Sequence, residues 1–175
     1  MELRDLTVRF GDKVVFDHRD FSLPDEGITL LAGPSGVGKT TLLKALFDKY
    51  RPDTAFLFQE DRLLPWRTVQ QHLKDVMDKS RWEEVPGILD LVELTGEEGS
   101  YPAQLSGGMA RRLALGRCLA LGGERYLLDE PFAGVDLPRQ ERILKGLRAL
   151  HKPILLTGHE GELGKWVDRV VTLEP

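Results

Sequence analysis

Short apolar runs recur along the chain and are separated by segments with helical periodicity. An almost unbroken apolar run of four or five residues is typical of a strand covered on both faces, as in a parallel sheet. The runs that predict such strands are ITLLA at 28–32, TAFLF at 54–58, RYLLD at 125–129, PILLT at 153–157 and RVVTL at 169–173.

Helices are predicted between these strands, at about 38–49, 109–121 and 138–150. Strands that alternate with helices indicate an α/β fold with a mainly parallel sheet. The amino-terminal part differs, because LTVRF at 6–10 alternates like a half-buried strand and Gly11-Asp12 turns the chain into KVVF. That pattern predicts an antiparallel β part at the amino terminus.

Residues 66–105 show helical patterns without a clear strand. We therefore expect one domain over 1–175, with a core formed by 1–59 and 106–175 and a small helical subdomain inserted at about 60–105. The segment between Lys49 and Thr54 contains little more than a turn, so helix and strand are joined almost directly.

Composition and charge narrow the class of protein. The 175 residues are 41% hydrophobic and 30% charged, as in ordinary globular domains, and the net charge of −4 gives no sign of a nucleic-acid partner. Arg111 and Arg112 form the densest basic pair, which is most simply a solvated helix face. The single cysteine, Cys118, cannot form an intrachain disulfide, which suits a reducing compartment. The chain begins without an apolar leader, and no apolar run approaches the ~20 residues of a membrane span.

A phosphate-binding loop is the strongest chemical signal. GPSGVGKT at 33–40 fits G-x-x-x-x-G-K-[ST] through Gly33, Gly38, Lys39 and Thr40. It follows an apolar strand and opens a helix, which is the context that this motif requires. The backbone N–H groups would surround phosphates, Lys39 would reach the β and γ phosphates, and the Thr40 hydroxyl would ligate Mg²⁺.

Two carboxylates follow the predicted strand at 125–129. Asp129 would hold the Mg²⁺, and Glu130 would polarise the attacking water. Ligands collect at this end of the strands in an open α/β sheet. The alternative is a pair of solvated carboxylates before a proline turn.

LSGGM at 105–109 looks like a second anion-binding helix start. Two glycines at the beginning of a helix leave N–H groups free to face an anion. Read alone, the stretch is equally an ordinary helix start with Ser106 as the capping residue.

The motifs together resemble the ATP-binding cassette (ABC) ATPase family, whose fold is a P-loop NTPase core. GPSGVGKT resembles its phosphate loop, LFQEDRLLPW its glutamine loop, LSGGM its signature, LLDEPFAGVD its second nucleotide motif and D-loop, and TGHE its switch histidine. The motifs occur in the family's order over essentially the whole chain. The stretch FQEDRLLPW resembles the corresponding segment of importers of the nitrate, sulfonate and taurine group. Departures are the short segment between Lys49 and Thr54, Met109 in place of glutamine and Glu160 in place of aspartate.

The resemblance implies a role for each matching residue, with ATP and Mg²⁺ as cofactors. Catalysis would use Glu130, His159 and Gln59, and the metal ligands would be Thr40, Gln59 and Asp129. Ser106, Gly107 and Gly108 would close on the ATP of a neighbouring subunit, with Asp136 in the D-loop. ATP would be bound by Phe10, Gly33, Pro34, Ser35, Gly36, Val37, Gly38, Lys39, Thr40 and Thr41.

Two of the aromatic residues keep an alternative. Phe10 would stack on adenine or belong to the core. Trp66, with the apolar residues before it, would form a surface covered by a membrane partner or a local core under the helical subdomain.

The resemblance also implies partners. They are a second copy of the chain in a head-to-tail homodimer, integral membrane permease subunits that hold it at the cytoplasmic face of the cell membrane, and an extracytoplasmic solute-binding protein. No nucleic acid is expected. The alternatives are a soluble ABC-type regulator or assembly factor and a non-hydrolysing ATP sensor, and the transported substrate is not encoded in an ATPase subunit.

Overall fold

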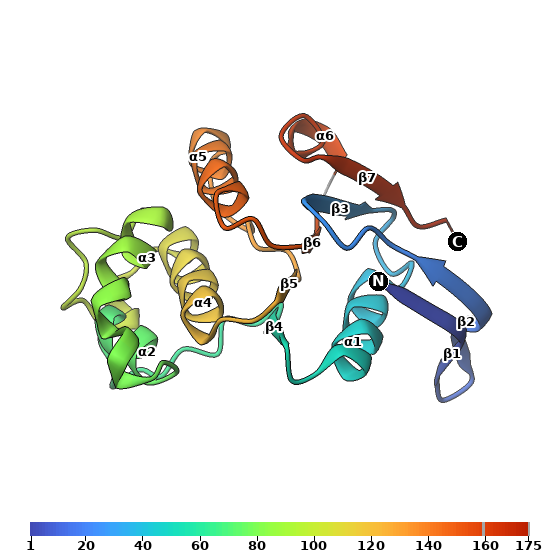
Figure 1. Ribbon diagram of the computed structural model, residues 1–175, viewed down its shortest axis with the longest axis horizontal. Helices are drawn as coiled ribbons and strands as arrows, with labels where there is room; N and C mark the ends of the chain where they lie inside the picture. Colours follow the sequence, from blue (N-terminus) through green and yellow to red (C-terminus); the bar gives the residue numbers. More distant parts are fainter. Residues whose placement is uncertain (159, 175) are drawn as a thin grey trace.

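A five-stranded parallel sheet forms the centre of the molecule (Figure 1), in a computed structural model that describes residues 1–158 and 160–174. The strand order is β4-β5-β6-β3-β7, and every neighbouring pair is parallel. The strands are β3 (Ile28–Ala32), β4 (Thr54–Leu57), β5 (Arg125–Leu128), β6 (Ile154–Thr157) and β7 (Arg169–Thr172). The predicted α/β fold with a mainly parallel sheet is confirmed.

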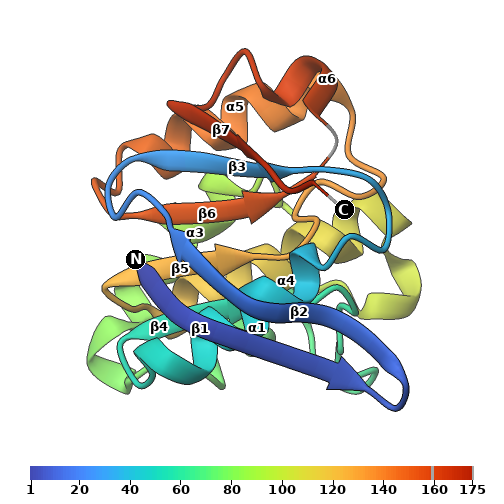
Figure 2. The same cartoon turned by 90° about the vertical axis from the view of Figure 1, so that its right-hand side faces the viewer.

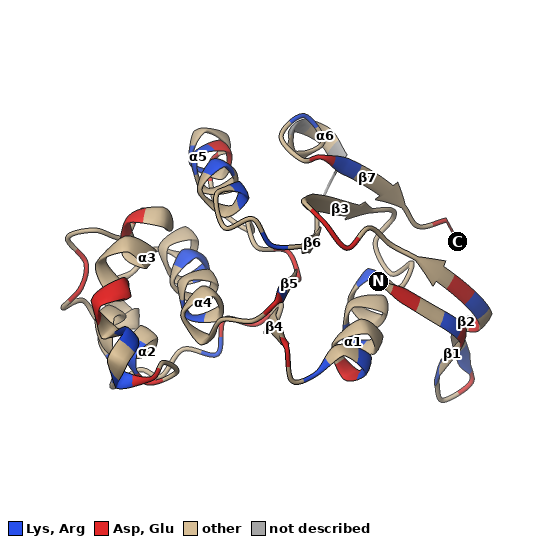
Figure 3. Ribbon diagram, viewed as in Figure 1, with Lys and Arg blue, Asp and Glu red and all other residues tan. Residues whose placement is uncertain are grey.

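The predicted antiparallel part is a hairpin of β1 (Glu2–Phe10) and β2 (Lys13–Ser22). Figure 2 shows it in front of the parallel sheet. Charges of both signs are interspersed on the hairpin (Figure 3), and some pair across it, as Arg9 does with Asp17 at 3.2 Å. Its inner side chains, including Leu3 and Phe16, are buried against the sheet and α1.

Helices cover both faces of the parallel sheet. Helix α1 (Lys39–Tyr50) lies on the hairpin side, and the other long helices lie on the opposite side (Figure 1). Those are α2 (Val69–Lys74), α3 (Val85–Leu91), α4 (Gly107–Leu121) and α5 (Leu137–Arg148), joined by the 3₁₀ turns η1 (Lys79–Glu84) and η2 (Pro102–Gln104) and followed by the short α6 (Glu160–Leu163). The sequence pattern predicted α1, α4 and α5 within about two residues, predicted helical structure without bounds over 66–105, and did not predict α6.

Alternate strand residues serve the two faces, which explains the unbroken apolar runs. Leu31, Leu127 and Leu155 belong to the hydrophobic cluster beneath the hairpin and α1. Their neighbours Leu30, Leu128 and Leu156 belong to the cluster that extends to α2–α5. All six leucines are buried.

Helix α4 connects the helical part with the sheet, since it contacts α2 and α3 and also β4. Both clusters are continuous, and the larger one includes residues of the helical part such as Val69 and Leu73. The division into a core and a subdomain at about 60–105 stays a prediction.

The segment between α1 and β4 is short, and side chains at the end of α1 contact the start of β1. Tyr50 ends α1, and its hydroxyl accepts a hydrogen bond from the Glu2 N–H at 2.8 Å. The Lys49 ammonium donates to the Glu2 carbonyl at 2.7 Å. These side chains tie the end of α1 to the start of β1 where the chain turns directly into β4.

One sequence-based interpretation is wrong. Arg111 and Arg112 do not form a solvated helix face, because they are 3% and 6% exposed and donate hydrogen bonds to backbone carbonyls on two sides of α4. Across the described residues, the structure contains no helix long and apolar enough to cross a membrane.

Candidate functional site

The loop 33–38 connects β3 to α1 and lies beside the hairpin. Gly38 is the residue before α1 and has φ 111°, a conformation that favours glycine. A Cβ at Gly38 would lie only 2.7 Å from the Phe16 ring. The position therefore needs glycine for two independent reasons, and the free N–H groups at the start of the 12-residue helix α1 remain beside the loop.

This loop forms one wall of a cleft of about 290 Å³. Residues after β4 and β5 and residues of the hairpin also line it. The lining residues are Phe10, Lys13, Val15, Ser35, Gly36, Gly38, Lys39, Thr40, Thr41, Gln59, Asp129 and Glu130. The structure thus brings most of the sequence-predicted site residues together, and the functions assigned to them stay predictions.

Lys39 is held by its own loop. Its ammonium donates hydrogen bonds to the carbonyls of Gly33 at 2.7 Å and Pro34 at 2.9 Å. These bonds keep the positive charge in the concave side of the loop, where an anionic ligand would receive it. Val37, which the sequence also assigned to this loop, is half-buried and packs toward the hairpin cluster.

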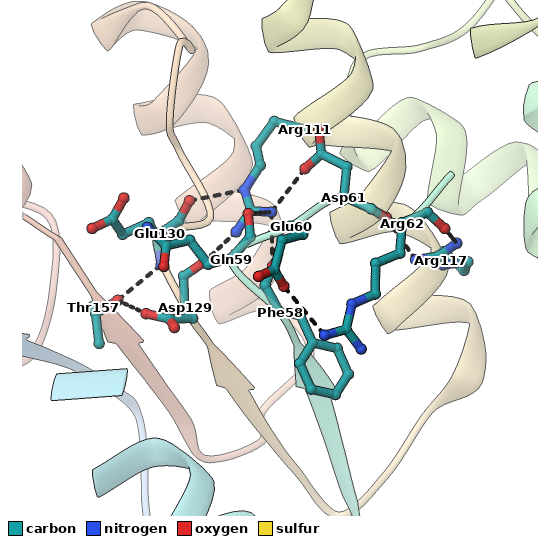
Figure 4. A network of polar contacts seen from close by, with 10 residues as sticks. All are labelled: Phe58, Gln59, Glu60, Asp61, Arg62, Arg111, Arg117, Asp129, Glu130 and Thr157. Atoms are coloured by element: carbon teal, nitrogen blue, oxygen red, sulfur yellow. Dashed lines mark hydrogen bonds and ion pairs between the residues drawn. The ribbon is translucent and has the colours of Figure 1, made fainter. Parts of the chain in front are cut away.

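Asp129 has one hydrogen-bonded carboxylate oxygen and one without a partner in the described part of the chain. It is 2% exposed, and its Oδ1 accepts a hydrogen bond from the Thr157 hydroxyl at 2.7 Å (Figure 4). Its Oδ2 is buried and has no hydrogen-bond partner among the described residues. A buried carboxylate oxygen without a partner is costly unless a cation or water binds it. Asp129 and the Thr40 hydroxyl, which line the same cleft, suit Mg²⁺ with phosphate oxygens and water as its remaining ligands.

Glu130 adopts an unusual backbone conformation at the cleft. Its φ is 48°, a value that residues with side chains rarely adopt outside functional or tight-turn positions. The Glu130 N–H donates to the Thr157 hydroxyl at 2.8 Å, so Thr157 holds both carboxylate residues at once. Glu130 is half-buried and Asp129 is buried, so the alternative of two solvated carboxylates is wrong.

Gln59 and Phe10 both line the cleft. Gln59 follows β4 with an exposed side chain, and its carbonyl accepts a hydrogen bond from Arg111 at 3.0 Å. Phe10 is 62% exposed at the end of β1, so the alternative of a core phenylalanine is wrong. Stacking of its ring on a base stays a prediction.

Trp66 is 67% exposed and is likewise not part of a local core, whereas Leu63 packs against the larger cluster.

The second glycine motif lies at the start of α4, outside the cleft. Ser106 caps the helix by accepting a hydrogen bond from the Met109 N–H at 3.3 Å. Gly107 and Gly108 form the first turn, and Ser106 and Gly107 are exposed. Asp136 caps α5 in the same way through the Arg139 N–H at 3.1 Å. His159, the predicted switch histidine, lies outside the described residues.

Lys13 and Val15 line the cleft but were not predicted, and the sequence analysis also missed Thr157 and Arg111, which hold residues of the cleft. Thr157 looked like the last residue of a buried strand, and Arg111 looked like part of a helix surface. The signal for Arg111 was a pair of adjacent arginines followed by the apolar run of α4. Figure 4 shows Thr157 and Arg111 with the residues that they hold.

Comparison with known proteins agrees with this geometry. Residues 16–133 match the protein family described as ABC transporter. The chain belongs to the ABC transporter family. Its P-loop NTPase fold also agrees with solved structures: a structure described as the ATP binding subunit of an ABC transporter has a TM-score of 0.84 at 23% identity, covering 99% of this chain and 85% of that one.

Among the relatives is the sulfate/thiosulfate import ATP-binding protein CysA of Mycobacterium tuberculosis, which is 34% identical over 200 residues. The alignment covers 97% of this chain but only 57% of CysA, so the chain spans little more than half the length of that relative. The aliphatic sulfonates import ATP-binding protein SsuB 2 of Streptomyces avermitilis is 37% identical over 99% of this chain and 76% of its own length. A putative ABC transporter ATP-binding protein from Pyrococcus furiosus has a TM-score of 0.80 at 25% identity, covering 98% of this chain and 96% of that chain.

Proposed function

We propose that this chain binds and hydrolyses Mg-ATP as the ATPase subunit of a bacterial importer. The observation that carries the proposal is the unpartnered Oδ2 of Asp129, buried in the cleft that the phosphate-binding loop and Glu130 also line. Most buried polar atoms in proteins have a hydrogen-bond partner, and Asp129 lines the cleft in which a cation would supply one.

The residues divide the chemistry among them. The loop 33–38 and the start of α1 bind the phosphates, while Lys39 exchanges its carbonyl partners for the β and γ phosphates. Thr40, Asp129 and Gln59 would hold Mg²⁺, which would supply positive charge to stabilise the phosphates in the reaction. Glu130 orients the attacking water and accepts its proton as the new bond to the γ phosphorus forms and the bond to the β–γ bridging oxygen breaks, so that ADP and phosphate result.

The same proposal gives the second glycine motif its role. The exposed Ser106 and Gly107 of one copy would close on the γ phosphate bound by a second copy, together with Gly108. A two-fold head-to-tail pair completes two equal sites at once. A solved bacterial ABC transporter cassette of the same fold, with a TM-score of 0.82 at 22% identity, is described as dimeric.

The relatives support an importer of small oxyanions, since they are named for the import of sulfate, thiosulfate and aliphatic sulfonates. In this proposal the chain lies at the cytoplasmic face of the cell membrane, bound to permease subunits, and an extracytoplasmic solute-binding protein delivers the substrate. Co-purification with an integral membrane protein would support this role, and a stable complex with only soluble proteins would favour the regulator or assembly factor.

The activity is tested by phosphate release from Mg-ATP. Glu130→Gln keeps the size of the side chain but replaces the carboxylate base with an amide, and we expect turnover to fall about 100-fold or more with ATP binding retained. Lys39→Ala serves as the contrasting variant, because it should weaken ATP binding itself. Turnover in Glu130→Gln equal to that of the unsubstituted chain would reject the role of Glu130.

A further inference from the structure

The Arg111 side chain reaches from α4 to the ends of two strands of the sheet. It is 3% exposed and lies one and a half turns after the helix cap, Ser106. Figure 4 shows its guanidinium between the segment after β4 and the segment after β5.

The guanidinium donates to five oxygen atoms. Its Nε–H donates to the Glu130 carbonyl at 2.9 Å, and Nη2 donates to the Asp129 carbonyl. Its Nη1 donates to the carbonyls of Phe58 at 2.8 Å and Gln59 at 3.0 Å, and to Asp61 Oδ1 at 2.8 Å. The backbone at the ends of β4 and β5 is therefore fixed by one planar group.

These carbonyls belong to the residues that carry the proposed chemistry. The backbone positions of Gln59, Asp129 and Glu130 decide where their side chains enter the cleft. A planar fork with five N–H donors can fix several carbonyls in one geometry, whereas a lysine ammonium acts as a single point charge on a flexible stem.

The same helix begins with the exposed Ser106 and the two glycines. We propose that Arg111 is a positioning residue that couples the two half-sites of one chain: it fixes the catalytic strand ends to the helix whose first turn serves the ATP of the partner subunit. This inference rests on the proposed function. Arg111 itself lines no part of the cleft and touches no reacting atom.

Arg112 provides a matched control. It is the next residue on the same helix, is 6% exposed, and donates to the carbonyls of Val92 and Glu93 just after α3, away from the cleft. Substitution of either arginine removes a buried guanidinium from α4, but only Arg111 contacts the catalytic strand ends.

The test compares Arg111→Lys with Arg112→Lys. For each variant we would measure the Kd for Mg-ATP by calorimetry, kcat and KM for phosphate release, and the thermal midpoint. For Arg111→Lys we expect kcat to fall about 10-fold or more while the Kd changes less than about 3-fold, because the lost contacts position the transition state rather than the nucleotide. For Arg112→Lys we expect the thermal midpoint to shift about as much as in Arg111→Lys, and kcat to stay within about 3-fold of the unsubstituted chain.

Equal kcat values for the two variants would overturn the inference and leave Arg111 as a structural contact only. If Arg111→Lys fails to fold, Asp61→Asn takes its place, because it weakens one partner of the guanidinium and leaves the arginine present. We then expect kcat to fall in the same direction with the Kd retained, and an unchanged kcat would overturn the inference.

The coupling itself is tested by a double-mutant cycle on kcat with Ser106→Ala and Arg111→Lys. Residues that act through one unit give a combined loss smaller than the product of the single losses. If the combined loss of kcat equals the product of the two single losses within about 2-fold, the coupling between half-sites is rejected. Failure of the unsubstituted chain to release phosphate from Mg-ATP would instead reject the proposed function, so the two failures are distinguishable.

Discussion

Thr157 determines which carboxylate oxygen of Asp129 is free. Its hydroxyl donates to Asp129 Oδ1 and accepts from the Glu130 N–H, and it is fully buried. One small side chain therefore orients both residues that the proposed chemistry needs, and it does so from the adjacent strand β6.

Thr157→Val keeps the shape of the side chain and removes the hydroxyl. Asp129 Oδ1 and the Glu130 N–H would each lose a partner, at a cost of about 1–3 kcal/mol for each buried group. We expect the Mg²⁺-dependent part of ATP binding to weaken about 10-fold, as measured by calorimetry over a range of Mg²⁺ concentrations. Thr157→Ser should restore it, and an unchanged Mg²⁺ dependence in Thr157→Val would contradict this role.

Single residues were predictable where a motif carries its own context. Lys39 and Asp129 could be located because a strand ends or a helix begins beside them, and these boundaries are visible in the sequence. Arg111 and Thr157 could not, because their importance comes from burial against segments about 20 to 50 residues away in the chain. Burial of a polar side chain depends on tertiary packing, which no local pattern encodes.

At the scale of elements, the first turn of α4 packs against the turn before α5. A Cβ at Gly108 would lie 2.5 Å from the Gly134 carbonyl oxygen, a distance that real side chains do not show. A Cβ at Gly107 would meet nothing within 4 Å. Close packing therefore requires glycine at position 108, whereas position 107 has room for a Cβ.

Alanine substitutions at the two positions test this difference. Gly108→Ala should lower the free energy of unfolding by about 1–3 kcal/mol, because the backbone at Gly134 must move. Gly107→Ala should leave it unchanged or raise it by up to about 1 kcal/mol, since alanine favours the helix. Urea denaturation of both variants measures the difference, and equal unfolding free energies would argue against the close approach of the two turns.

His72 fixes the loop before α2. Its Nδ1 lies 2.8 Å from the Thr68 carbonyl, and its Nε2 accepts from the Leu64 N–H at 2.9 Å, which requires a neutral ring. Burial lowers the pKa of His72 below its usual 6.5. The unfolded chain then binds a proton that the folded chain rejects, so this contribution to stability is complete above about pH 6.5 and is lost as the pH falls below it.

We expect urea unfolding at pH 5.5 to show a lower free energy than at pH 7.5, and His72→Gln to show a smaller difference between the two pH values. Equal differences for the two proteins would assign the pH dependence to other groups.

Most elements were predictable because nearly every buried strand has apolar residues on both faces. The helices between them were also predicted, including their approximate ends. The tie between the end of α1 and the start of β1 was not, because it depends on side chains of Lys49 and Tyr50 that meet Glu2 only in the folded chain.

For the whole molecule, the cleft and the exposed start of α4 predict a ligand-dependent change of mass. ATP added to Glu130→Gln should convert a monomer into a dimer in light scattering, because the nucleotide remains unhydrolysed between two copies. Adding Ser106→Arg should abolish that shift while ATP binding by the monomer is retained. Loss of ATP binding in the monomeric double variant would contradict the assignment of Ser106 to the partner's site.

The arrangement of the cleft was predictable at this scale from a general property of parallel sheets. The carboxyl ends of β3, β4 and β5 lie at one edge, so the segments that follow them meet there. The sequence shows each segment separately, and the topology brings them into one cleft.

Helix α4 has a genetic consequence in the proposed dimer. Its first turn would serve the partner's nucleotide, while Arg111 holds the strand ends beside its own. A subunit with a defective α4 would therefore impair both composite sites of any dimer that it enters. In a cell that makes variant and unsubstituted chains in equal amounts, random pairing leaves only about a quarter of the dimers intact. Substitutions that disrupt α4 as a whole should consequently behave as dominant alleles.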